Sequence, residues 1–108
     1  MHRRAVSAPL VTAVVVIATA LSGCGSSGSE EPTASGATLY AANCARCHGA
    51  TGGGGIGPSL ANVAATFPDV ENQITFVSSG GGGMPRFGDL LSDADIREVV
   101  AYTRATFR

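Results

Sequence analysis

The chain has 108 residues, of which 44% are hydrophobic and 14% charged, and its formal net charge is −1 at pH 7. Its basic residues are all arginines and are fewer than its acidic residues, so the sequence offers no basic surface for the phosphates of a nucleic acid. A chain of this length suits one small domain, whose core is marginal unless a disulfide, a metal or a cofactor supports it.

Residues 1–23 have the pattern of an export signal. The chain opens with a short basic stretch, and Ala5–Leu21 then carries no charge. The run ends in Leu21-Ser22-Gly23-Cys24, which resembles the lipobox of bacterial lipoproteins, where cleavage precedes the cysteine and a diacylglyceryl group is attached to its sulfur. We therefore expect residues 1–23 to be a lipoprotein signal peptide and Cys24 to be lipidated.

The alternative to lipidation is an uncleaved anchor helix. Ala5–Leu21 lies at the short end of the roughly 17–25 residues that span a bilayer. Both interpretations place the domain outside the cytoplasm, beside a membrane and facing the periplasm or the cell exterior. Residues 24–35 are small, polar and acidic, which is typical of a flexible linker, and residues 36–108 are expected to form a single domain.

Two cysteines and a histidine stand together in Cys44-Ala45-Arg46-Cys47-His48. This is the C-x-x-C-H spacing of c-type haem attachment, in which two thiols on one turn reach the vinyl groups of a porphyrin and the histidine binds the iron. A redox disulfide is the first alternative, but it is expected within a βαβ pattern that is absent here. A structural zinc site is the second, but it requires four protein ligands.

The iron of such a haem needs a sixth ligand if it is to be closed to substrates. Once residues 1–23 are removed, His48 is the only histidine and Met84 the only methionine. Met84 follows four glycines and precedes a proline, which predicts a loop rather than the periodic apolar face on which a core methionine would lie. Methionine with histidine is a ligand pair found in cytochromes c, so Met84 is predicted to be the second axial ligand.

Two helices are predicted from local signals. Residues 69–79 follow Pro68, carry acidic residues in their first turn and precede Gly80. The second helix starts after Ser92, a good N-cap, and continues with an apolar stripe at helical spacing.

Over residues 36–108 the sequence resembles the class I cytochromes c, small bacterial carriers with a single haem. The resemblance implies an all-α fold of three to four short helices wrapped around one covalently bound haem. Gly36 and Tyr40 lie where that family places a glycine and an aromatic residue on its N-terminal helix, and Val99 and Tyr102 match its crossing pair on the C-terminal helix.

The same resemblance assigns further contacts to the haem. Pro58 is expected to accept a hydrogen bond from His48 Nδ1–H through its backbone carbonyl, which would fix the orientation of the ring. Leu60 is expected to lie against the macrocycle, and Ile74 and Val77 of the helix over residues 69–79 are expected to face it.

The resulting hypothesis is an electron carrier tethered to a membrane, and not an enzyme, because an iron with both axial positions filled has no room for substrate. Its partners would be membrane-bound or periplasmic redox proteins. Two alternatives remain: a fixed electron-entry subunit of a membrane dehydrogenase or oxidase complex, and a haem peroxidase or ligand sensor in which Met84 is displaced.

Overall fold

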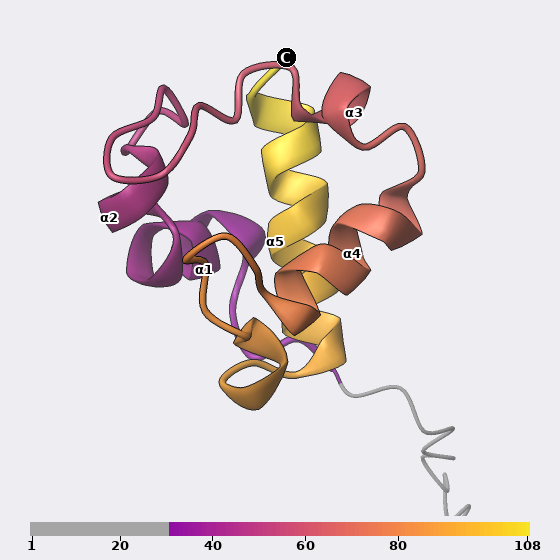
Figure 1. Cartoon of the computed structure of the whole chain (residues 1–108). Coiled ribbons are helices and arrows are strands. Elements are labelled where there is room, and N and C mark those ends of the chain that lie inside the picture. The colour runs from indigo at the N-terminus through magenta and orange to yellow at the C-terminus, as the bar shows by residue number, and fades with distance from the viewer. Residues whose placement is uncertain (1–30) are drawn as a thin grey trace, which may run out of the picture.

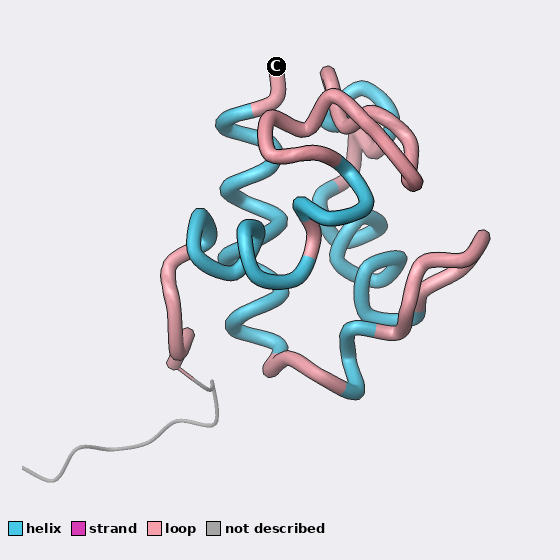
Figure 2. Tube along the Cα trace, turned by 90° about the vertical axis from the view of Figure 1, so that its left-hand side faces the viewer, coloured by secondary structure: helices cyan, strands magenta, loops and turns pink. Residues whose placement is uncertain are grey.

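The computed structural model of the chain describes residues 31–108, so the predicted signal peptide, Cys24 and most of the linker lie outside the described residues. The helices are α1 (Gly36–Asn43), α2 (Ala45–His48), α3 (Val63–Thr66), α4 (Val70–Ser79), the 3₁₀ turn η1 (Phe87–Asp89) and α5 (Asp93–Thr106). No strand forms within residues 31–108, which confirms the all-α class (Figure 2). Helices α1, α4 and α5 are the longer ones; of the three short turns, α2 is the turn expected for the two cysteines, and α3 and η1 were not indicated by the sequence.

The longest helix, α5, forms the centre of the fold (Figure 1). Its N-cap is Ser92, as predicted, and the Ser92 side chain accepts a hydrogen bond from the Asp95 backbone N–H at 3.1 Å. The buried stripe of the helix consists of Ile96, Val99, Val100 and Thr103, besides Asp95 in the first turn. In Figure 1, α1 and α2 lie on one side of α5 and α4 on the other.

The predicted helix over residues 69–79 is α4, and its boundaries show how it starts. Asp69 is the N-cap, and its side chain accepts from the Glu71 backbone N–H at 2.9 Å. Pro68 therefore lies immediately before the cap, and the helix itself starts one residue later than predicted. The helix ends at Gly80, whose φ of 71° favours glycine.

Helices α1 and α5 cross in close contact at Gly36. A Cβ atom on Gly36 would lie 2.5 Å from the Glu98 carbonyl oxygen and 2.6 Å from the Tyr102 Cβ atom. The Tyr40 ring lies 5.6 Å from the Tyr102 ring, centroid to centroid. The crossing predicted from Gly36, Tyr40 and Tyr102 is thus confirmed.

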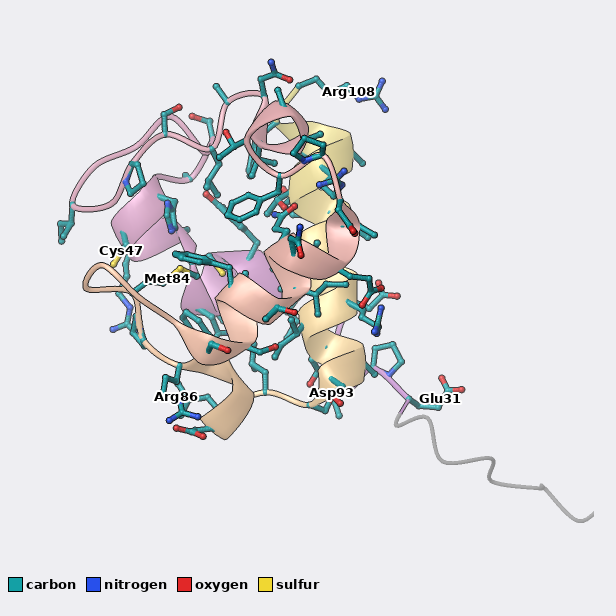
Figure 3. All side chains as sticks on the ribbon, turned by 45° about the vertical axis from the view of Figure 1, so that its right-hand side comes forward. Glu31, Cys47, Met84, Arg86, Asp93 and Arg108 are labelled. Carbon is teal, nitrogen blue, oxygen red and sulfur yellow. The ribbon has the colours of Figure 1, made fainter. Side chains whose placement is uncertain are left out.

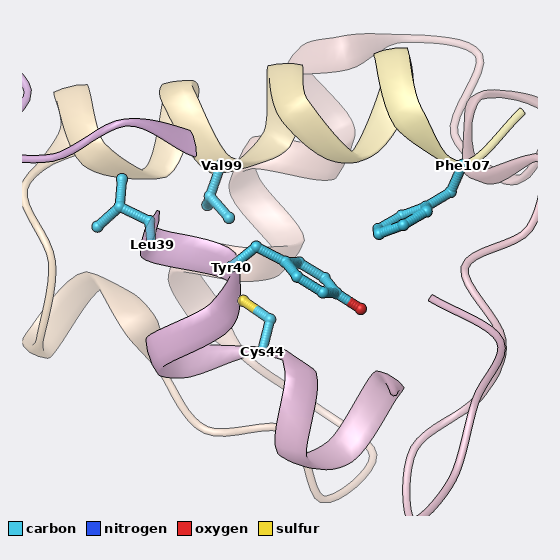
Figure 4. Close-up of a cluster of buried hydrophobic side chains, with 5 residues drawn as sticks. All are labelled: Leu39, Tyr40, Cys44, Val99 and Phe107. Atoms are coloured by element: carbon cyan, nitrogen blue, oxygen red, sulfur yellow. The ribbon is translucent and has the colours of Figure 1, made fainter. Parts of the chain in front are cut away.

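A cluster of buried side chains fills this crossing and reaches the haem-attachment segment. Its members are Leu39, Tyr40, Cys44, Val99 and Phe107 (Figure 4). Tyr40 also donates its hydroxyl proton to the Gly49 carbonyl oxygen at 2.6 Å, which ties α1 to the end of α2. The core therefore fixes α1 against α5, and α2 is held through α1.

The segment before α1 is tied to the start of α5. Thr33 donates both its backbone N–H and its hydroxyl to the Asp95 carboxylate, at 2.7 and 2.9 Å. The Thr33 backbone N–H holds the pKa of Asp95 below its usual value, because it stabilises the charged form. Among the helices of residues 31–108, none is both long and apolar enough to cross a membrane.

Candidate haem-binding site

A cavity of about 920 Å³ lies between α2, α4, α5 and the loops that follow α2 and α4. Its volume is near the upper end of the roughly 300–1,000 Å³ typical of ligand pockets, and its walls are mainly apolar. All the predicted site residues within the domain line it: Cys44, Cys47, His48, Pro58, Leu60 and Met84. The fold therefore brings together one set of side chains from three separate segments.

The two cysteines belong to the single turn of α2: Cys44 is its N-cap and Cys47 is its third residue. Cys44 ends α1 and begins α2, and its backbone N–H donates to the Tyr40 carbonyl oxygen at 2.9 Å. The two cysteines are not joined in a disulfide; Cys44 is buried and Cys47 is partly exposed. Burial raises the pKa of the Cys44 thiol to about 11, so this group is protonated at neutral pH when it is unmodified.

His48 is the buried histidine at the end of α2. Its Nδ1 atom lies 2.8 Å from the Pro58 carbonyl oxygen. A carbonyl can only accept a hydrogen bond, so Nδ1 carries the proton and Nε2 is left with a lone pair that can bind a metal. Gly57, next to Pro58, leaves little room for a side chain, since a Cβ atom there would lie 3.2 Å from both the ring and the Cys47 carbonyl oxygen.

The first tetraglycine, residues 52–55, folds back against α2. The Gly54 and Gly57 backbone N–H groups donate to the carbonyl oxygens of His48 and Cys47, at 2.8 and 2.7 Å. Gly52 and Gly54 have φ values of 72° and 99°, which other residues rarely adopt. The loop thereby satisfies carbonyl groups at the end of α2 and delivers Pro58 to His48.

Met84 enters the cavity from the loop that follows α4, and its side chain is partly buried. The second tetraglycine forms this loop, and Gly81 and Met84 exchange two backbone hydrogen bonds at 3.0 and 3.1 Å. All four glycines, Gly80–Gly83, have positive φ values. Figure 3 shows Met84 and Cys47 on the same side of the domain. The glycines thus form the tight turn that carries Met84 to the cavity.

Residues 31–102 match the family described as cytochrome c oxidase, cbb3-type, subunit III. Cytochrome c6 of Picosynechococcus sp. is 37% identical over 105 residues, which cover 86% of this chain and 88% of that protein. The chain belongs to the class I c-type cytochromes. Its structure is similar to that of cytochrome c6 from the diatom Phaeodactylum tricornutum, with a TM-score of 0.57 and 38% identity over 65% of this chain and 87% of that one.

The cytochrome matches only part of a longer relative. The cbb3-type cytochrome c oxidase subunit FixP of Azorhizobium caulinodans is 40% identical over 83 residues, which are 67% of this chain but 28% of FixP. The chain therefore corresponds to one part of that subunit.

The cofactor of the cytochrome is one covalently bound c-type haem with iron, and its function is electron transfer through this haem. The residues present fit the group. The cavity is large and mainly apolar, as a porphyrin requires, and it holds two thiols, an imidazole and a thioether. Two thiols followed by a histidine are the side chains that attach a c-type haem, and a thioether is one of the groups able to bind its iron.

One predicted contact differs in the structure. Ile74 does not line the cavity, whereas Gln73, Phe76 and Val77 do. Residues 73, 76 and 77 share one face of α4 because they are three and four positions apart, and this is the face that lines the cavity. Gln73 was missed because a polar residue at that position hides the apolar periodicity.

Proposed function

We propose that the cytochrome is a membrane-tethered one-electron carrier with His48 and Met84 as the axial ligands of its haem. One observation carries the proposal: both side chains line the same cavity, and Met84 is the only methionine of residues 31–108. The pair would fill both axial positions of the iron, so no substrate could bind there. The cytochrome is accordingly proposed to be a carrier and not an enzyme.

Each site residue has a distinct task in this proposal. The Cys44 and Cys47 thiols would hold the haem by adding across its two vinyl groups, with each sulfur bonded to one vinyl carbon and the thiol proton taken up by the other. Pro58 keeps the proton of His48 on Nδ1. Leu60 and Val77 line the cavity and exclude water. The bound haem supplies a one-electron Fe(III)/Fe(II) couple.

The tether of the proposal is a lipid on Cys24. Cys24 lies outside the described residues, and the support comes from its position in the sequence after an apolar run that ends in a lipobox-like tetrapeptide. Figure 3 places Glu31, the first described residue, on the side of the domain away from Cys47 and Met84. A tether entering there would leave the cavity side turned toward partners, which we propose to be membrane-bound or periplasmic redox proteins.

A fixed electron-entry subunit of a membrane complex is the second candidate. The match to the family of cbb3-type oxidase subunits favours it. Co-purification separates the two: a fixed subunit stays in a stoichiometric complex after detergent extraction of membranes, whereas a carrier is recovered alone.

The proposed ligation is tested on the wild-type protein. Thioether ligation of ferric iron gives a near-infrared charge-transfer band, and a closed iron in the reduced protein does not bind carbon monoxide. We expect the band to be present and carbon monoxide to leave the spectrum unchanged. Ready binding of carbon monoxide would favour the peroxidase or ligand-sensor alternative, in which Met84 is displaced.

A further inference from the structure

A polar cluster formed by Gln73, Thr103 and Arg104 reaches the mainly apolar wall of the cavity. Gln73 and Thr103 line the cavity and are only 4% and 6% exposed. The Gln73 Nε2 atom donates to the Thr103 hydroxyl at 3.1 Å, and this hydroxyl donates to the Val100 carbonyl oxygen at 2.8 Å. The Arg104 Nη1 atom donates to Gln73 Oε1 at 3.0 Å. Gln73 therefore separates the Arg104 guanidinium from the cavity.

The charge of Arg104 is held by neutral groups. Besides Gln73, its guanidinium donates to the carbonyl oxygens of Phe67 and Pro68, at 2.7 and 3.4 Å. The ion pairs within residues 31–108 involve Arg86 and Arg97 instead. Of the arginines in this range, Arg104 alone is partly buried, and the others are exposed. Arg104 thus carries a positive charge without a carboxylate partner, and the Gln73 side chain lies between this charge and the cavity.

We propose that Arg104, positioned by Gln73, raises the reduction potential of the haem. The inference rests on the haem being bound in the cavity, as in the proposed function. On reduction, ferric iron takes one electron from a redox protein and becomes ferrous, no bond or proton changes place, and the positive charge of the site falls by one unit. A fixed cation nearby therefore favours the ferrous state. Because Arg104 is partly buried, salt screens its charge less than that of an exposed arginine.

Three variants distinguish an effect of the Arg104 charge on the potential from an effect of Arg104 on the fold. Arg104→Gln removes the charge but keeps N–H donors, Arg104→Lys keeps the charge, and Arg108→Gln removes the same charge from an exposed residue near the end of α5. The midpoint potentials of the holoproteins are measured by spectroelectrochemistry at low and high salt. We expect Arg104→Gln to lower the equilibrium constant for reduction about tenfold, equal to about 59 mV for one electron, at both salt concentrations. Arg104→Lys and Arg108→Gln should change it less than twofold.

Gln73→Glu gives a second test in a protein that keeps Arg104. The carboxylate has nearly the shape of the amide and would pair with the guanidinium, so it should lower the potential in the same direction. Equal losses in Arg104→Gln and Arg104→Lys would show that Arg104 only supports the fold. A shift of Arg104→Gln that disappears in high salt would show that its charge is screened and does not set the potential, which would also overturn the proposal. The near-infrared band reports the proposed ligation separately: its absence from the wild type would refute that ligation and leave the comparison of potentials valid.

Discussion

Gly36 touches Tyr102 where α1 crosses α5, and the contact leaves no space for a side chain. A Cβ atom on Gly36 would lie 2.6 Å from the Tyr102 Cβ atom and 2.5 Å from the Glu98 carbonyl oxygen. Gly36→Ala must therefore push the helices apart. We expect it to lower the free energy of unfolding of the holoprotein by about 1–3 kcal/mol, the usual cost of overpacking, in denaturant titrations followed by circular dichroism.

Ala37→Ser is the matched control for this crossing. Ala37 lies on the same helix but is exposed, so we expect a change within about 0.5 kcal/mol. Equal stability of Gly36→Ala and Ala37→Ser would mean that the crossing is looser than the structure indicates.

The Asp95 carboxylate makes stability depend on pH. Thr33 lowers the pKa of this group in the folded state, so the interaction contributes fully above the unfolded pKa of about 3.9 and is lost as the pH falls through the lower folded pKa. We expect Asp95→Asn to lower the thermal midpoint at pH 7 and to approach the wild type at strongly acidic pH. Asp93→Asn, which changes an exposed carboxylate in the same turn, should not reproduce this convergence.

Covalent attachment can be tested by extraction. Wild-type haem should remain with the protein in acid acetone, because both thiols would be bonded to it. The double change of Cys44→Ser and Cys47→Ser should abolish the holoprotein, since the small domain loses its attachment and much of its core. Free extraction of haem from the wild type would contradict the assignment of both cysteines.

Met84→Ala tests the sixth ligand. Loss of the thioether should open the iron, lower the midpoint potential and allow the reduced protein to bind carbon monoxide. Leu90→Ala changes an exposed apolar side chain that also lines the cavity and should have none of these effects on the iron. If Met84→Ala keeps the wild-type near-infrared band, another group is the ligand.

The sequence predicts the parts of this site that depend on rare residues or on local signals. The C-x-x-C-H spacing has one common chemical meaning, and Ser92 and Gly80 are signals that act within one turn of their helices. It does not predict which face of α4 turns toward the cavity. A shift of one residue in the assigned apolar face puts Ile74 where the structure has Gln73. Neither does the sequence predict the bond between Arg104 and Gln73, which joins residues 31 positions apart and depends on how α4 lies against α5.

The proposed lipid on Cys24 is tested by a variant that cannot carry it. Cys24→Ser, exported through a substitute signal peptide, removes the sulfur that would carry lipid and leaves residues 36–108 intact. We expect an unchanged absorption spectrum and release of the protein from the membrane fraction. Retention in that fraction after a high-salt wash would instead favour a membrane anchor independent of Cys24.

The same variant also tests what the tether does for electron transfer. Confinement near a membrane raises the effective concentration of the carrier toward membrane-bound partners without any new contact. Electron delivery to a membrane oxidase should therefore slow in Cys24→Ser at matched total protein. Reduction by a small soluble dye should proceed at the wild-type rate, because the dye gains nothing from confinement. A slower reaction with both acceptor and dye would trace the defect to the haem domain, and an unchanged rate with the oxidase would mean that the tether is not needed for delivery.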